Sequence, residues 1–141
     1  MTYDAFLDTV QDRLPTDDRE DAAHVATVVL ETFSEILYRT ERDKLTSPLP
    51  KPLKRPIQAP QPESSRRNTE RLNAKAFLDR IQARADVNRD EAQTATRVVL
   101  DVLRDAVGES ILSEIARQLP SSYADIFPFM DRTASPGSAA S

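Results

Sequence analysis

Residues 89–120 decide the fold, and they read RDEAQTATRVVLDVLRDAVGESILSEIARQLP. Their apolar residues recur at spacings of three and four, which predicts an amphipathic α-helix rather than a strand. This apolar stripe consists of Ala92, Ala95, Val99, Val102, Leu103, Ala106 and Val107. Asn88 with Glu91 predicts a capped start, and Gly108 predicts the end of the helix. We expect a second helix to follow, with Ser110 as its cap.

A weaker copy of this stretch lies 70 positions earlier, at residues 19–50. At that offset, identical residues pair Arg19, Ala22, Val28, Val29, Leu30, Leu49 and Pro50 with Arg89, Ala92, Val98, Val99, Leu100, Leu119 and Pro120. At an offset of 71, Ala5, Phe6, Leu7, Asp8, Gln11 and Arg13 match Ala76, Phe77, Leu78, Asp79, Gln82 and Arg84. This agreement predicts a duplicated helical unit. A unit of roughly 50 residues buries little core alone, so we expect the two units to pack into one all-α bundle.

The remaining segments give a domain division. Helices are expected from Tyr3 to Arg13 after a Thr2 cap, after an Asp18 cap, and from Ala74 to Ala85 after an Asn73 cap. This predicts a first helical repeat at 1–57, a linker at 58–72, a second repeat at 73–130 and a disordered tail at 131–141.

The junction between the repeats is less regular. Residues 42–49 are expected to form a short or frayed helix, because Leu45 is their only large apolar residue before Pro48. Prolines at 48, 50, 52, 56, 60 and 62 then predict an extended linker that cannot hold a helix and that begins near Lys51. Within it, Leu53 and Ile57 match Tyr123 and Phe127 at the offset of 70, so each pair is expected to pack against its own half.

Both repeats carry a family resemblance. The residues concerned are the Arg89–Ala92 helix entry, the Val98–Leu100 centre, and Gln118-Leu119-Pro120 followed by Tyr123-Ala124-Asp125-Ile126-Phe127. This pattern resembles the bacterial proteins grouped as domain of unknown function 2267, and the likeness covers most of the chain. The first half departs from the pattern at Ser47-Pro48-Leu49-Pro50. The resemblance implies an all-helical, duplicated, bacterial protein, and it carries no activity or functional residues with it.

Composition narrows the class of function. Without cysteine and with only two glycines, the chain has neither a cysteine-based metal site nor a glycine-rich phosphate loop. The single histidine, His24, does not make a typical zinc site alone. Carboxylates such as Asp17 and Asp21 lie in an exposed helix start, with nothing apolar to raise a pKa. We therefore expect a non-enzymatic, cofactor-free protein; the enzyme alternative is a metal-dependent hydrolase with its site between Asp17 and His24.

Charge is unevenly distributed along the chain. Residues 44–75 hold eight basic and two acidic side chains, whereas residues 1–43 hold four basic and eleven acidic ones. Six basic residues form the candidate anion-binding set: Lys51, Lys54, Arg55, Arg66, Arg67 and Arg71. They could bind nucleic acid or an anionic membrane surface, or they could be a solvated linker lying against acidic neighbours. No aromatic residue interleaves them, so base stacking is not expected.

The expected mode of action is binding. The partner is a protein, a second copy of the chain or, as the alternative, a nucleic acid or acidic lipid surface. The first residues lack a basic region followed by an apolar run, so no signal peptide is expected. No apolar run approaches the roughly 18 residues that a transmembrane helix needs, and a cytoplasmic location is expected.

Overall fold

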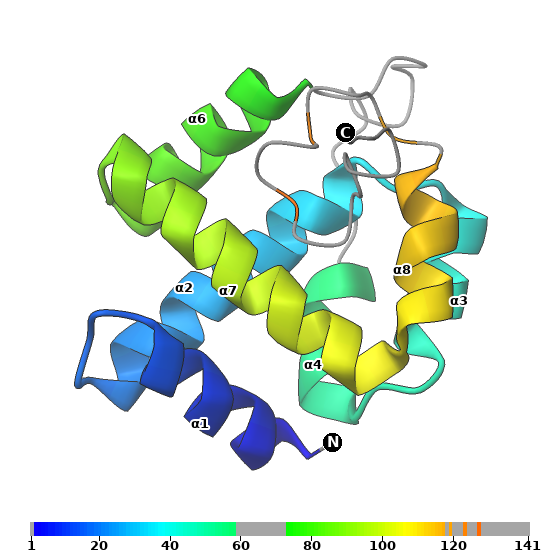
Figure 1. Cartoon of the computed structure of the whole chain (residues 1–141), viewed down its shortest axis with the longest axis horizontal. Coiled ribbons are helices and arrows are strands. Elements are labelled where there is room, and N and C mark those ends of the chain that lie inside the picture. The colour runs from blue at the N-terminus through cyan, green and yellow to red at the C-terminus, as the bar shows by residue number, and fades with distance from the viewer. Residues whose placement is uncertain (1, 59–72, 118, 120–122, 124–126, 128–141) are drawn as a thin grey trace, which may run out of the picture.

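In a computed structural model of the chain, the structure describes residues 2–58, 73–117, 119, 123 and 127 (Figure 1). Their secondary structure is all-α, as predicted, with no strand among them. The helices are α1 (Tyr3–Arg13), α2 (Arg19–Glu35), α3 (Arg39–Thr46), α4 (Lys51–Gln58), α6 (Ala74–Ala85), α7 (Arg89–Val107) and α8 (Glu109–Ala116). No helix in these described ranges is long and apolar enough to cross a membrane.

Local hydrogen bonds set most of the predicted helix starts. The Thr2 hydroxyl accepts from the Ala5 amide at 3.1 Å. Asn88 and Glu91 form the expected capping box, with distances of 2.8 and 3.0 Å. At the starts of α2 and α6, the side chains of Asp18 and Asn73 each accept a single backbone hydrogen bond, from Glu20 and Ala76 respectively. The prediction for α8 was wrong, because the helix begins at Glu109 directly after Gly108, which has a positive φ of 97°, and Ser110 is already helical.

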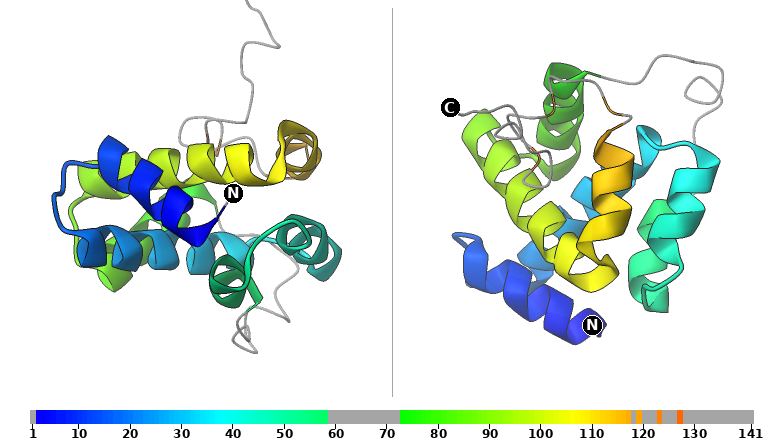
Figure 2. Two further views of the ribbon diagram at one scale, coloured as in Figure 1. Left: turned by 90° about the horizontal axis from the view of Figure 1, so that it is seen from below. Right: turned by 45° about the vertical axis from the view of Figure 1, so that its right-hand side comes forward.

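The two long helices, α2 and α7, cross at the centre of the molecule. Both begin at the end where the α1–α2 and α6–α7 corners lie, and α3, α4 and α8 lie toward the other end (Figure 1). Figure 2 shows the same separation from two further directions. The N-termini of both long helices therefore face one end of the molecule.

The halves of the chain interleave rather than stand side by side. The helix α1 packs against its neighbour α2 and also against α7, while α6 packs against α7 and also against α2. The helix pairs α2–α7 and α3–α8, which occupy matching positions in the two halves, are also in contact. Buried apolar residues of both halves form one continuous core, as expected for a single bundle.

An aromatic cluster lies where the halves meet. The Phe33 ring meets Phe127 edge to face at 5.5 Å between centroids, and Phe77 meets Tyr123 and Phe127 in the same geometry at 5.6 and 5.4 Å. Tyr123 and Phe127 are stacked at 4.6 Å. These contacts join α2 to α6 and to the chain beyond α8, and they use four of the eight aromatic residues of the sequence.

The third helix of the first half is present and well bounded. The structure places it at Arg39–Thr46, so it begins three residues earlier than expected. It starts there because the Glu41 carboxylate accepts from the Tyr38 backbone amide at 2.8 Å, and Leu45 is fully buried. Its bounds match those of α8 at an offset of 70 residues, the offset of the predicted repeat.

The prediction that the proline-rich segment cannot hold a helix was wrong for Lys51–Gln58, which forms α4. Pro52 lies in the first turn, where a backbone N–H would have no helical partner in any case. The Pro50 carbonyl accepts instead from Leu53 and Lys54, at 3.0 and 3.1 Å. Pro56 lacks the N–H that would reach the Pro52 carbonyl, but its ring is buried with Leu53 and Ile57 against the core.

The burial expected for the matched apolar pairs is confirmed. Leu53 and Ile57 are 2% and 0% exposed, and Tyr123 and Phe127 are 0% and 2% exposed. Of the predicted linker at 58–72, Gln58 belongs to α4 and residues 59–72 lie outside the described residues. The predicted tail at 131–141 lies outside them as well.

Candidate functional site

The helix α4 presents three cations to solvent. Lys51 and Arg55 are exposed, Lys54 is half-buried, and α4 contains no acidic residue. Spacings of three and four place these residues on one side of the helix, opposite the buried Leu53 and Ile57. We call Lys51, Lys54 and Arg55 the α4 basic face. The structure thus gathers three of the six candidate anion-binding residues, and Arg66, Arg67 and Arg71 lie outside the described residues.

Most other cations of the described chain are matched by a carboxylate. Ion pairs involve Arg13, Arg19, Lys44, Lys75, Arg80, Arg84, Arg89 and Arg104. Within the described ranges, no residue of the α4 basic face forms such a pair, and neither do Arg39 and Arg42 of α3. Unmatched positive charge is therefore concentrated on α3 and α4, which pack against each other.

The second half of the sequence lacks this charge at the matching positions. Seventy residues after Lys51, Lys54 and Arg55 stand Ser121, Ala124 and Asp125. The apolar partners keep their character, since Leu53 and Ile57 correspond to the buried Tyr123 and Phe127. Burial at these positions therefore does not require the cations, so their presence on α4 calls for another explanation.

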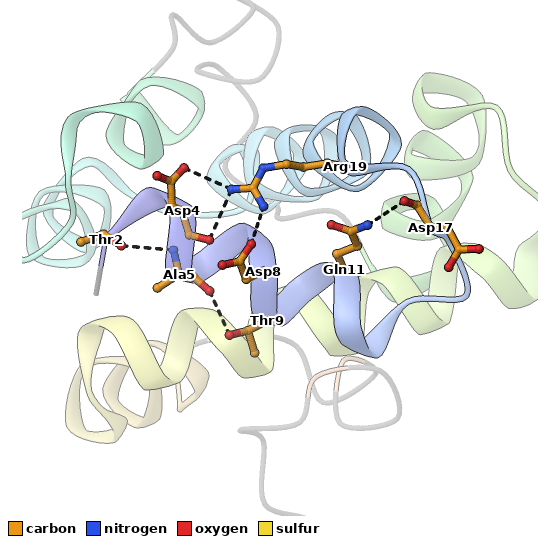
Figure 3. Close-up of polar contacts among 8 residues, drawn as sticks. All are labelled: Thr2, Asp4, Ala5, Asp8, Thr9, Gln11, Asp17 and Arg19. Atoms are coloured by element: carbon orange, nitrogen blue, oxygen red, sulfur yellow. Dashed lines mark hydrogen bonds and ion pairs between the residues drawn. The ribbon is translucent and has the colours of Figure 1, made fainter.

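Ion pairs near α1 have a structural role. Figure 3 shows Arg19 of α2 reaching the carboxylates of Asp4 and Asp8 on α1, with 3.1 Å to Asp4. Gln11 adds a hydrogen bond of 2.8 Å to the Asp17 carbonyl. In the second half, Arg89 of α7 pairs with Asp79 of α6 at 3.2 Å. Arg19 and Asp8 match Arg89 and Asp79 at the offsets of 70 and 71, so the same type of contact joins the first two helices of each half.

Among the ion-paired carboxylates of the described chain, that of Glu35 is the most buried, with 7% of its side chain exposed. One of its oxygens accepts from Arg80 and the other from Arg84, both on α6. Arg84 also donates to the Thr32 hydroxyl at 3.1 Å. Since both oxygens are engaged by guanidinium groups, Glu35 joins α2 to α6 across the halves and is poorly placed to act as a general base.

The proposed hydrolase region gains no support from the geometry. His24 is exposed on α2, and Asp17 and Asp21 are exposed as well. No group of three or more His, Asp or Glu side chains within the described ranges could hold a metal ion. The exposed acids lie near the start of α2, where a negative charge interacts favourably with the helix dipole.

Acidic and basic surfaces lie toward opposite ends of the bundle. Exposed carboxylates near the starts of α2 and α7 are Asp17, Asp18, Glu20, Asp21, Asp90 and Glu91. Both helix starts lie at one end of the molecule, whereas α3 and α4 lie toward the other (Figure 1). In a chain with a formal net charge of −4, α4 itself is free of acids, and the acidic residues on its neighbours include Asp43 of α3.

Comparison with known proteins supports the family assignment. The family model described as an uncharacterized conserved protein (DUF2267) matches residues 3–126. No curated protein and no solved structure matches the chain. The match spans the described helices α1 to α8 together with the residues between the two halves. With this coverage, the chain belongs to the DUF2267 family of uncharacterized conserved proteins.

Proposed function

We propose that this protein acts by binding an anionic partner, without catalysing a reaction, through the α4 basic face. One observation carries the proposal. Lys51, Lys54 and Arg55 form no ion pair in the described chain, whereas most of its other cations do. Cations that form no ion pair within the described chain can interact with an external anion at little cost, since no internal ion pair must first be broken.

Electrostatics gives this surface a preferred orientation toward a polyanion. The carboxylates at the starts of α2 and α7 are repelled by a negatively charged surface, and the cations of α3 and α4 are attracted to it. Binding of this kind weakens steeply as salt rises, because exposed charges are screened over about 10 Å at 0.1 M ionic strength. A protein with a calculated isoelectric point near 5.0 would otherwise be expected to avoid polyanions at neutral pH.

Retention on immobilised heparin tests the proposal with a general polyanion. We expect the unchanged protein to be retained at low salt and to elute as salt rises. The variant with Lys51→Gln, Lys54→Gln and Arg55→Gln is expected to pass through unretained, with unchanged helix content by circular dichroism.

A matched control separates local charge from net charge. Arg13→Gln, Lys75→Gln and Arg97→Gln remove the same total charge from α1, α6 and α7. This control variant is expected to be retained nearly as well as the unchanged protein. Equal loss of retention in both variants, or no retention of the unchanged protein at low salt, would refute the proposed function.

A further inference from the structure

We propose, on the basis of the proposed function, that the anionic partner is double-stranded nucleic acid and that α4 is the helix that contacts it. The chain folds locally into two short helices, α3 (Arg39–Thr46) and α4 (Lys51–Gln58), joined by residues 47–50. Both belong to a three-helix unit, because α4 packs on α3 and on the long helix α2. Two short helices joined by four residues form an αα-hairpin, and the α4 basic face lies on its solvent-exposed side.

The dimensions of α4 suit a duplex. An α-helix with its side chains is about 10–12 Å in diameter, which fits the major groove of about 12 Å, and at a rise of 1.5 Å per residue the eight residues of α4 extend about 12 Å. Lys51 and Arg55 lie about 6 Å apart along the helix axis, with Lys54 between them. Arg39 and Arg42 on the neighbouring helix α3 add two cations, and Asp43 is the exposed acid on that helix.

Other anionic partners fit this surface less well. Membrane-binding helices insert apolar side chains, whereas the apolar residues of α4 other than the exposed Pro52 are buried in the core. Proteins that bind single strands stack bases on aromatic residues, and α4 has none. An acidic protein partner would be expected to need an apolar centre in the contact surface, which is also missing from the exposed side of α4.

The direct test is fluorescence anisotropy with a labelled 20-base-pair duplex of mixed sequence at several salt concentrations. We expect a dissociation constant in the range of about 1 to 100 μM for such nonspecific contacts. With about three to five phosphate contacts, the slope of log K against log salt is expected to be about −3 to −4.5. A single Lys51→Gln change should make this slope shallower by about one.

Variants and alternative probes make the outcome decisive. The variant Lys51→Ser, Lys54→Ala, Arg55→Asp carries the residues of the second half, so it is expected to fold and to bind the duplex at least tenfold more weakly. The same binding assay with the corresponding single strand and with phosphatidylserine vesicles compares the three anions. Tighter binding of the single strand or of the vesicles than of the duplex, or unchanged duplex binding by the variant, would overturn the inference.

The same measurements separate this inference from the proposed function. Retention on heparin without duplex binding would refute the duplex as partner and leave the α4 basic face as an anion-binding surface. Absence of both heparin retention and duplex binding would refute both proposals.

Discussion

At the scale of single residues, charged side chains that join the halves should matter more than charged side chains that face water. We expect Glu35→Ala to lower the free energy of unfolding by about 1–2 kcal/mol, because it removes charge-assisted hydrogen bonds from an enclosed carboxylate. The loss is moderated by solvent, since the Arg80 and Arg84 side chains are 38% and 36% exposed and can be hydrated. Urea denaturation measures the change.

Glu31→Ala is the control for this change. Glu31 is half-buried on the same helix, and its side chain forms no ion pair within the described ranges. Its replacement is expected to change the free energy of unfolding by less than about 0.5 kcal/mol. If the two substitutions had equal effects, the contact between Glu35 and α6 would not stabilise the bundle.

A second residue-level prediction concerns the contact between α3 and α8. The Lys44 ammonium group lies 2.7 Å from the Glu114 carboxylate, and this hydrogen bond lowers the pKa of Glu114 below its ordinary value. A carboxyl group with a lowered folded-state pKa stabilises the fold above its unfolded-state pKa, and this contribution is lost as pH falls through the folded-state pKa.

Nuclear magnetic resonance titration of the Glu114 carboxyl carbon tests this assignment. In the Lys44→Met variant, the pKa is expected to rise toward the ordinary value for glutamate, although Arg117 still lowers it to a smaller extent. An unchanged pKa in this variant would show that Lys44 does not hold the carboxylate.

At the scale of elements, α4 is part of the bundle despite its prolines. We expect Leu53→Ala or Ile57→Ala to lower the free energy of unfolding by about 2–4 kcal/mol, because both side chains are almost fully buried. Lys54→Ala, on the exposed side, should change it by less than about 0.5 kcal/mol. Thermal or urea unfolding measures these changes. Leu53 and Ile57 variants as stable as the unchanged protein would show that α4 does not pack into the core.

At the scale of the whole molecule, the two halves should fold as one unit. Each first helix packs on the long helix of the other half, and buried residues of both halves share one core. A fragment of either half alone would expose a large apolar surface, so we expect separate fragments of residues 1–58 and 73–141 to be mostly unfolded and to gain helix when mixed.

Limited proteolysis tests the same interdependence in the full chain. After a trypsin cut at Arg66 or Arg67, the two fragments are expected to elute together in size-exclusion chromatography and to separate only in denaturant. Two fragments that eluted separately, each with native helix content and cooperative unfolding, would show that the halves are independent domains.

Several features could be predicted from the sequence alone because they depend on neighbours a few residues apart. The starts of α1, α2, α6 and α7 follow from cap residues whose hydrogen bonds reach only two or three positions along the chain. The apolar stripe of α7 depends on the same short periodicity. The residues of the α4 basic face were also identifiable as candidates, because charged residues can be read directly from the sequence.

The tertiary structure decided the features that depend on distant contacts. The prolines of Lys51–Gln58 argue locally against a helix, but burial of Leu53 and Ile57 against the core outweighs the lost hydrogen bond. Ion pairs such as Arg13 with Asp101 join residues 88 positions apart, so their partners cannot be read from neighbouring residues. The unmatched charge of α4 became visible only when the long-range partners of the other cations were known, because pairing depends on distance in space rather than along the chain.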